Sequence, residues 1–508
     1  MGLLSLIILV PVVALIVVLC LPAGKDHFIK WTALLAMGVN VVLSTFLLVD
    51  YLGLLKTRGM ATATDGSLRL DYVERFPWLG QLGIEYYVGV DGISVLMIFL
   101  TAVVIFCGVC ASWRHTHRVR EFFVFLLLLV TGVFGVFAAN DLFLFFLFYE
   151  VAVLPMYLLI GLWGTGPKEY SAMKLTLMLM GGSALIVVGI LVMYFESGST
   201  SFAISEIARH GIPRSTQLWL FPLMFFGFGT LGGLWPFHTW SPDGHASAPT
   251  AVSMLHAGVL MKLGGYGCLK TVYLMPEGAL FWSTFFLALT TINIFYGALV
   301  ATQKTDLKYI TAYSSVSHCG LVLFGLATLN PIACQGAMVQ MYAHGLMTAL
   351  FFALVGMIYG RTHTRFVTEM GGLLKVMPFL GVAYFIGGLS GLGLPGLAGF
   401  VAEIQVFIGA FALKTPWHRV MTVLAAASVV ISAVYLLRAL TRMFYGPLAQ
   451  AEHGRLNDAT FVEKVPLAIL VFLLAFSGIF PGWMIRMIEY SMSPVLAQLQ
   501  QFRPPPGL

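Results

Sequence analysis

Long runs of apolar residues, separated by short polar stretches, repeat along the whole chain. Each run is long enough for an α-helix to cross the hydrocarbon core of a bilayer, which takes roughly 17–25 residues. The pattern therefore predicts an all-α membrane protein with about fourteen transmembrane helices. These helices are expected near residues 2–22, 31–53, 91–111, 122–139, 141–162, 174–195, 218–238, 247–275, 279–300, 309–329, 335–359, 379–411, 420–445 and 465–489.

The first apolar run and the longest connection need separate interpretations. Residues 2–22 lack a basic segment at their start and a clear cleavage site, so we interpret them as a retained helix and not as a signal peptide. The longest connection, Gly53 to Val90, is mixed in charge and is expected to hold a hairpin on the surface. No connection leaves room for a separate soluble domain.

The composition agrees with a membrane location. Of the 508 residues, 59% are hydrophobic and only 10% are charged, whereas a soluble domain has about 25% charged residues. The net charge of +6 is spread over the loops, which argues against a nucleic-acid partner. The six cysteines suggest no disulfide framework. Cys107 and Cys110 form a single CxxC inside an apolar run, and without a second pair we interpret them as small helix residues and not as a metal site.

Lysines and arginines in the loops predict the orientation of the chain. Cytoplasmic loops of membrane proteins carry an excess of these residues. If the N-terminus lies outside, the loops on the inner side carry more lysine and arginine than the outer loops, and the densest run, Arg114 to Arg120, lies inside. The bias therefore predicts that both termini lie on the outer side.

The stretch from Gly227 to Lys270 combines a broken helix with buried polar residues. The seventh apolar segment breaks near Gly232 and Pro236, and the eighth carries Lys262. Hydrocarbon cannot satisfy irregular backbone or ionisable groups, so these features persist only where protein or water covers them. A broken helix followed by a lysine-bearing helix is therefore a candidate ion pathway.

A second interrupted segment, Gly387 to Glu403, lies in the second half of the chain. Paired broken helices in two halves are typical of transporters with internal repeats, although Gly and Pro kinks can also serve packing alone. We predict two five-helix repeats with broken helices 7 and 12, the second inverted because five is an odd number. The predicted units are residues 1–120 with helices 1–3, 121–275 as the first repeat, 276–446 as the second, and 447–508 with helix 14.

Five ionisable residues lie inside predicted helices: Glu150, Lys262, His318, His344 and Glu403. Each has a structural alternative: a local hydrogen bond for Glu150, snorkelling of Lys262 to an interface, core packing for the histidines, and a helix-terminus role for Glu403. Together they supply carboxylate, lysine, histidine, histidine and carboxylate across both repeats. Such groups hold and release protons, so the set predicts a proton relay along the membrane plane.

Several long motifs resemble those of the antiporter-like membrane subunits of respiratory complex I, NADH:quinone oxidoreductase. They are VGVDGISVLMIFLT, AANDLFLFFLFYE, LFYEVAVLPMYLLIGLWG, WPFHTWSPDGHASAPTAVSMLHAGVLMKLGGYG, AYSSVSHCG and GLGLPGLAGFVAE. The resemblance covers nearly the whole chain and extends to multisubunit sodium/proton antiporters and membrane-bound hydrogenases. It implies fourteen helices, two inverted repeats, and one proton channel driven by quinone chemistry in other subunits.

The resemblance also implies a role for each buried ionisable residue. Glu150 resembles the glutamate of helix five, Lys262 the lysine of helix eight, and His318 and His344 the central histidines. Glu403 resembles the glutamate of helix twelve. That glutamate indicates the M type of subunit, called subunit 4 in mitochondria, because the L and N types are expected to carry lysine there.

One position departs from the family pattern. The resemblance implies a lysine five residues before Pro236, and this sequence has Leu231 there. Glu150 therefore lacks its usual lysine partner, and we expect Lys262 to be the main cation of the first half.

Two histidines are further candidates in the first half, as groups that assist Lys262. His238 lies in the run that matches the family. His256 lies six residues before Lys262, which in a regular α-helix is about 9 Å at 1.5 Å per residue. That spacing suits a step through one bridging water.

The resemblance implies a proton-translocating subunit that carries no redox chemistry, cofactor or metal of its own. FMN, iron–sulfur clusters and quinone are expected in partner subunits, and the L-type and N-type subunits and small membrane subunits are expected as neighbours. The alternative is a subunit of a cation/proton antiporter or of a membrane-bound hydrogenase. We expect a multi-pass protein of the bacterial inner (plasma) membrane, with a mitochondrial or thylakoid membrane as the alternatives.

Overall fold

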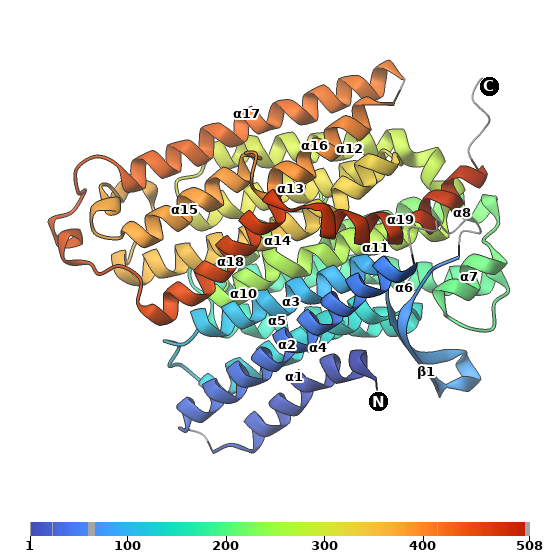
Figure 1. Ribbon diagram of the computed structural model, residues 1–508, viewed down its shortest axis with the longest axis horizontal. Helices are drawn as coiled ribbons and strands as arrows, with labels where there is room; N and C mark the ends of the chain where they lie inside the picture. The colour runs from blue at the N-terminus through green and yellow to red at the C-terminus, as the bar shows by residue number, and fades with distance from the viewer. Residues whose placement is uncertain (1, 23, 59–66, 414, 503–508) are drawn as a thin grey trace.

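The described chain is almost entirely helical, and its long helices run side by side (Figure 1). The computed structural model describes residues 2–22, 24–58, 67–413 and 415–502. Within these ranges, 11 helices are long and apolar enough to cross a membrane. They are α1 (Leu3–Cys20), α2 (Asp26–Arg58), α3 (Gly92–Ala111), α4 (Val119–Ala138), α5 (Leu142–Trp163), α6 (Lys168–Ser197), α12 (Pro276–Gln303), α13 (Leu307–Ala327), α14 (Pro331–Thr362), α17 (Pro416–Phe444) and α18 (Phe461–Ile479).

Several of these helices begin at a residue whose side chain caps them. The side chains of Asp91, Asp141, Asp306 and Asn330 accept hydrogen bonds from the first backbone N–H groups of α3, α5, α13 and α14. Such caps satisfy donors that the helix itself leaves free. Helices α3, α13 and α14 are buried along most of their length and form the centre, whereas α1, α2, α6 and α17 expose most of their apolar surface.

The remaining predicted segments are the two broken helices and the lysine-bearing helix between them. In the first break, α8 (Arg214–Leu231) ends, residues 232–239 leave the helix, and the short α9 (Trp240–Ser247) follows. The chain continues as α10 (Thr250–Leu255), the π-helical turn η2 (His256–Leu260) and α11 (Met261–Leu274). Protein groups satisfy the irregular backbone, as hydrocarbon cannot: Trp235 N–H donates to Asn293 Oδ1 at 2.7 Å, and Trp240 Nε1 donates to the Thr230 carbonyl at 2.9 Å.

The second break separates α15 (Pro378–Gly391) from α16 (Ala398–Phe411). Gly393 and Gly396 take positive φ angles of +62° and +93°, which residues with a Cβ rarely adopt. The two breaks confirm that helices 7 and 12 are interrupted. Each break falls in the fourth of five successive segments, counted from α4 in the first half and from α12 in the second.

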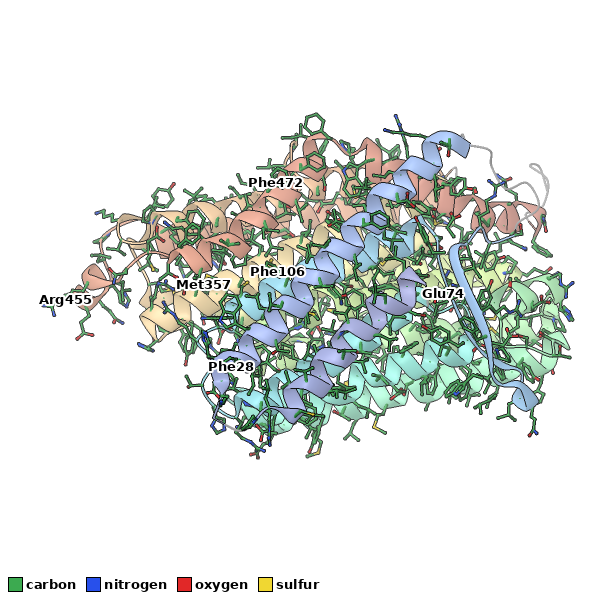
Figure 2. All side chains as sticks on the ribbon, turned by 60° about the horizontal axis from the view of Figure 1, so that its bottom comes forward. Phe28, Glu74, Phe106, Met357, Arg455 and Phe472 are labelled. Atoms are coloured by element: carbon green, nitrogen blue, oxygen red, sulfur yellow. The ribbon has the colours of Figure 1, made fainter. Side chains whose placement is uncertain are left out.

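A two-stranded hairpin lies between α2 and α3, as predicted for this connection. Strands β1 (Asp71–Leu79) and β2 (Ile84–Val90) pair antiparallel across the short turn η1 (Gly80–Leu82). The Glu74 carboxylate of β1 accepts hydrogen bonds from the N–H of Gly2 at 2.8 Å and from the N–H and hydroxyl of Ser5 at 3.1 and 2.7 Å. These bonds fasten the hairpin to the start of α1 (Figure 2).

The predicted single segment at residues 465–489 is wrong, because two helices occupy this region. Helix α18 ends at Ile479, and Pro481 prevents its continuation because proline has no N–H to donate. Helix α19 (Gly482–Phe502) then follows. It buries Met484, Met487, Ile488 and Ser491, the spacing of one face of an amphipathic helix.

The basic loops gather at one end of the bundle, opposite the hairpin. Arg361 pairs with Glu463 at 2.6 Å, Arg114 lies 3.7 Å from the same carboxylate, and Arg365 pairs with Asp306 at 3.2 Å. Figure 2 shows Arg455 at this end and Glu74 at the other.

Two short connecting helices and three 3-10 turns complete the described elements: α7 (Ile204–His210) and α9, and η3 (Val367–Glu369), η4 (Leu373–Lys375) and η5 (Ala451–Arg455).

Candidate functional site

Lys262 lies buried in the centre of the bundle. Its side chain is 1% exposed, so it does not snorkel to an interface. Its Nζ lies 2.7 Å from Nδ1 of His344 and donates to the carbonyl of Ala257. That carbonyl belongs to the π-helical turn η2, a rare turn that often occurs at functional sites. The turn thus supplies the buried ammonium with an acceptor five residues earlier in the chain.

Two histidines continue from Lys262 into the second half of the chain. His344 of α14 and His318 of α13 have ring centres 5.3 Å apart. The Gln340 amide lies 3.1 Å from Nδ1 of His318, and the Cys319 sulfur lies 3.9 Å from Nδ1 of His344. Within the described residues, Nε2 of each ring has no hydrogen-bond partner. Each imidazole therefore keeps one nitrogen free to accept or release a proton.

Glu403 stands at the far end of this row. Its Oε1 lies 3.8 Å from Nδ1 of His318, and its side chain is nearly buried. A Cβ at Gly393, in the second break, would overlap the Glu403 carboxylate. The broken backbone thus comes close to the glutamate, and only glycine permits that approach at a positive φ.

A small cavity adjoins Glu403 and is lined partly by hydroxyl groups. Ser317, His318, Ser428 and Ser432 are among the residues around it, and its volume is about 10 Å³. This is about the room that one water molecule needs, and several polar groups are available to hold it. The four groups from Lys262 to Glu403 therefore form one row, which we call the central row.

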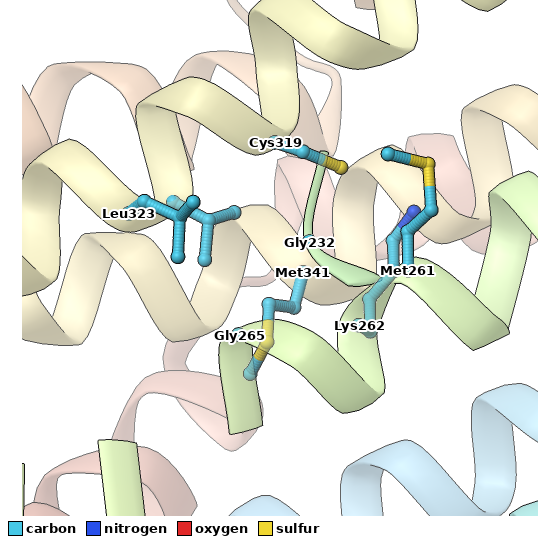
Figure 3. A pocket seen from close by; sticks show the side chains of 8 residues that line it. Gly232, Met261, Lys262, Gly265, Cys319, Leu323 and Met341 are labelled. Atoms are coloured by element: carbon cyan, nitrogen blue, oxygen red, sulfur yellow. The ribbon is translucent and has the colours of Figure 1, made fainter. Parts of the chain in front are cut away.

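A second cavity of about 10 Å³ lies beside Lys262, next to the first break (Figure 3). Its lining includes Gly232, Met261, Cys319 and Met341. Gly232 directly follows Leu231, the position where the family resemblance implies a lysine. Leu231 is fully buried at the end of α8, so an apolar side chain occupies that place. Lys262 lines the same cavity as Gly232, so its side chain lies next to the first break.

Glu150 stands apart from the central row. It lies in the middle of α5 and is half-buried. Its carboxylate oxygen Oε1 has no hydrogen-bond partner among the described residues. The described part of the chain provides no contact between Glu150 and Lys262, so the structure brings together four of the five predicted ionisable residues.

The regular α-helix that was assumed between His256 and Lys262 is not present. The prediction assumed a regular α-helix, whereas His256–Leu260 form the π-helical turn η2. The His256 ring stacks on Trp240 at 5.1 Å and lies 4.2 Å from the ring of His245. The hydrogen-bond partner of Lys262 on a neighbouring helix is His344, because α14 packs closely against the turn η2, where Gly258 and Gly345 meet.

His238 and His245 lie near the first break. His238 is buried against Tyr296, with ring centres 4.8 Å apart, and no hydrogen bond to either ring nitrogen occurs within the described ranges. His245 was missed as a candidate; its Nε2 lies 3.4 Å from the Met261 sulfur, and the WSPDGH run was the available signal. The two rings of His245 and His256 thus form a small buried group beside α11.

The sequence also missed Lys308, which it placed in a loop. Lys308 is buried and donates to the carbonyl of Ala248 at 2.6 Å, and Arg365 donates to the carbonyl of Ala246 at 2.9 Å. Both carbonyls lie at the C-terminal end of α9, where the helix dipole favours cations. These two cations hold the short half of the broken helix in place.

Comparison with known proteins adds independent information. The family described as "NADH:quinone oxidoreductase/Mrp antiporter, TM" matches residues 139–432. The chain is 36% identical to the NAD(P)H-quinone oxidoreductase chain 4 2 of Synechococcus sp. (strain JA-3-3Ab), over 98% of this chain and 94% of that protein. It is also 36% identical to chain 4-2 of Synechocystis sp. (strain ATCC 27184 / PCC 6803 / Kazusa), over 91% of this chain and 82% of that protein.

Solved structures give the same result at the level of the fold. A chain of respiratory complex I from Thermus thermophilus with bound NADH matches with a TM-score of 0.87 and 27% identity, over 98% of this chain and 99% of that chain. A chain of the Mrp complex from Dietzia sp. DQ12-45-1b matches with a TM-score of 0.81 at 19% identity, over 98% of this chain and 100% of that chain. The second similarity concerns the fold alone.

Proposed function

The chain belongs to the NADH:quinone oxidoreductase/Mrp antiporter family of membrane subunits, and we propose that it is the M-type, proton-translocating subunit of an NADH:quinone oxidoreductase. The single observation that carries this proposal is the central row of Lys262, His344, His318 and Glu403 inside the bundle. A row of buried proton-exchanging groups has no use in a static scaffold, since each buried charge is costly.

The chemistry of the row suits stepwise proton transfer. The Lys262 ammonium gives a proton to Nδ1 of His344, at 2.7 Å, and becomes a neutral amine. His344 and His318 pass a proton on through the small gap between their rings. A water in the cavity beside Glu403 then serves the last step to the carboxylate. Two protonated groups next to each other in this low-dielectric row repel each other strongly. A proton that binds at one end of the row therefore favours the release of a proton at the other end.

The two halves of the chain have different roles in this proposal. We assign residues 121–275 and 276–446 to the two inverted repeats, flanked by residues 1–120 and 447–508. Glu150 holds a proton in the first repeat, and Lys262, which pairs with His344 and not with Glu150, is the main cation of that half in place of a lysine at position 231. His238 and His256 assist there as buried proton acceptors, and Glu403 serves the second repeat.

The chain itself supplies no redox group in this proposal. FMN, the iron–sulfur clusters and quinone belong to partner subunits, and L-type and N-type antiporter-like subunits are the neighbours. The electron-transfer reaction acts on this subunit through those neighbours, by changing the proton affinity of its buried groups. We place the protein in the bacterial inner or thylakoid membrane, in keeping with its cyanobacterial relatives.

The test is a proton-pumping assay on the assembled complex in vesicles. Lys262→Ala is expected to slow proton transfer through this chain on the order of 100-fold, the contribution of a positioned acid–base group, while NADH:quinone electron transfer continues. Lys304→Ala is the control, because Lys304 lies in the loop after α12 and outside the central row. Normal pumping by an assembled Lys262→Ala complex would refute the proposed role.

The alternative is a cation/proton antiporter or hydrogenase membrane subunit, and the same preparation distinguishes it. The purified complex should oxidise NADH and contain flavin and iron–sulfur subunits if the proposal is right. A complex without NADH-oxidising subunits that exchanges sodium for protons would establish the alternative.

A further inference from the structure

A cleft of about 820 Å³ opens between the end of α2 and the junction of α18 with α19. Leu52 and Leu55 of α2 line one side, and Phe476 and Phe480 of α18 line the other together with Trp483 of α19. Helices α2, α18 and α19 each pack against α3, which connects the two sides of the cleft. The volume lies within the range of ligand-binding clefts, about 300–1,000 Å³.

A stripe of aromatic rings leads from this cleft along α18. Phe472, Phe476 and Phe480 follow one another at intervals of four residues, so they share one face of the helix. Neighbouring ring centres are 5.7 Å apart, and all three rings are exposed. The Trp483 ring continues the stripe, with its centre 6.4 Å from that of Phe476. Figure 2 shows Phe472 on the side of the bundle that also carries α2.

The polar part of the cleft is positively charged. Lys56 of α2 and Arg486 of α19 both line it, and both are exposed. Neither side chain has an ion pair or a hydrogen bond with the described residues, and no carboxylate occurs among the described residues of the lining. A third cation, Arg69, donates from Nη1 to the hydroxyl of Tyr490 at 3.2 Å, and Tyr490 also lines the cleft. An apolar wall thus adjoins positive charge that the lining does not neutralise.

The cleft lies at the level of lipid headgroups. Helix α3 begins at Gly92, and the N–H of Gly92 donates to the hydroxyl of Ser491 in α19 at 2.6 Å. Tyr490, the residue before Ser491, therefore lies beside the start of a membrane-spanning helix, where the hydrocarbon ends. Tyrosine and tryptophan are typical of this level, and long cationic side chains reach the headgroups there. The predicted orientation makes it the outer side, because the basic loops lie at the opposite end.

We propose that this cleft binds an anionic phospholipid of the outer leaflet. Its phosphate lies between Lys56 and Arg486, because both present N–H donors and a guanidinium can bind two phosphate oxygens at once. The start of α19 at Gly482 also lines the cleft, and its first turn contains no acidic residue, so the helix dipole favours the same negative charge. One acyl chain lies against Leu52 and along the aromatic stripe of α18.

A zwitterionic lipid fits this cleft less well. The positive group of such a lipid would meet two cations and no carboxylate among the described lining residues. A neighbouring membrane subunit is the other occupant that an exposed apolar surface can have. The charge and the depth favour the lipid, since phosphate groups are abundant at this level, whereas a protein would have to bring carboxylates to both Lys56 and Arg486. The inference goes beyond the proposed function and does not depend on the proton path.

Photolabelling of the purified complex in detergent tests the proposal. The probe is phosphatidylglycerol with a photoreactive diazirine in one acyl chain, and peptide mass spectrometry locates the attachment after irradiation. We expect labelling within residues 49–56 and 472–486. Unlabelled phosphatidylglycerol should compete with the probe, and phosphatidylcholine should compete at least about tenfold less well, because each cation near an anionic lipid contributes on the order of fivefold in affinity.

A charge-removing variant and a matched control separate this site from general lipid contact. Lys56→Gln/Arg486→Gln should lower the labelling of both segments on the order of 10-fold to 30-fold, by the loss of two such cations. Both side chains are exposed, so the complex should assemble. Arg214→Gln/Arg419→Gln removes two exposed arginines at the starts of α8 and α17, outside the cleft, and should be labelled like the wild type.

Unchanged labelling of Lys56→Gln/Arg486→Gln would overturn the proposal, and so would equal competition by phosphatidylcholine. A protein occupant gives a different result: Leu55→Cys would then crosslink to another subunit through a bifunctional thiol reagent, and the lipid probe would leave both segments unlabelled. That outcome would make the cleft a subunit interface and refute lipid binding there. Proton pumping is not measured in this experiment, so its result does not depend on the proposed function.

Discussion

At the scale of single residues, burial gives the central row its chemical character. Each of Lys262, His318, His344 and Glu403 is no more than 7% exposed, so neighbouring side chains and not solvent decide its charge. The distances along the row, 2.7 Å at one end and 3.8 Å at the other, allow a proton to move in short steps. Glu150 differs because it is half-buried and lies outside this row.

Glu403 provides a test at this scale. Glu403→Gln keeps the size and hydrogen-bonding capacity of the side chain but cannot ionise, whereas Glu403→Asp keeps the titrating carboxyl. We expect Gln to slow proton transfer on the order of 100-fold and Asp by much less, because a positioned acid–base group contributes about that factor. Proton pumping per quinone reduced measures both, with assembly checked on a native gel. Equal losses in the two variants would indicate a packing role for Glu403.

At the scale of elements, glycines allow the broken helices to approach their neighbours. A Cβ at Gly264 of α11 would overlap the backbone of Gly232, where α8 ends. This contact holds the first break directly against the helix that carries Lys262. Gly393 plays the corresponding role beside Glu403. In both halves, the irregular backbone is thus placed next to an ionisable side chain, which hydrocarbon alone would not permit.

The hairpin is the second element whose attachment depends on one ionisable residue. Burial tends to raise the pKa of Glu74, but hydrogen bonds from the hydroxyl and N–H of Ser5 and from the N–H of Gly2 outweigh it and lower the pKa below the usual 4.5. A carboxyl whose pKa is lowered on folding stabilises the fold fully above its usual pKa, and this contribution is lost as the pH falls through the lowered value.

We therefore expect the hairpin to loosen from α1 on acidification below about pH 4.5. Hydrogen exchange at residues 71–90, corrected for the intrinsic effect of pH, should accelerate in the wild-type protein. Glu74→Gln should exchange faster already at neutral pH and should show little further change on acidification, while Glu85→Gln in the partner strand serves as the control. A wild-type hairpin that stays equally protected across this range would contradict the role of Glu74.

At the scale of the whole molecule, the ends of the bundle differ in charge. The loops with Arg114, Arg361 and Arg365 contact one another or the same acidic residues at one end, and the hairpin and α19 lie at the other. The positive-inside rule assigns the basic end to the cytoplasm. The end with the hairpin and α19 is therefore the outer end in this assignment.

Thiol labelling in membranes tests this orientation. Thr116 and Gln81 are exposed at the basic end and in the hairpin turn, respectively. In a chain with Cys20→Ser, a membrane-impermeant thiol reagent should label Gln81→Cys in right-side-out vesicles and Thr116→Cys only in inside-out vesicles. The opposite pattern would invert the assigned orientation.

The length and apolarity of the helices were determined by the sequence alone, because a hydrophobic run either is or is not long enough to cross a bilayer. The two breaks were equally visible, since Gly and Pro interrupt an apolar run in an unmistakable way. The end of α18 was not predicted from these local signals, although a single proline, Pro481, divides the apolar stretch into two helices there. The candidate residues could be found because an ionisable group in an apolar run has few explanations.

Only the tertiary structure decided which of these residues meet. Lys262 contacts His344, which lies 82 positions away in the sequence, because α14 packs against the π-helical turn η2 in the centre of the bundle. His256 precedes Lys262 by six residues, but His256–Leu260 form a π-helical turn, and the His256 ring stacks on Trp240. The regular α-helix assumed from the sequence is therefore absent there. Lys270 and Asp91, a buried pair whose Nζ and Oδ2 atoms lie 3.6 Å apart, are likewise far apart in the sequence. A contact between distant segments depends on how helices pack, and neither local spacing nor composition contains that information.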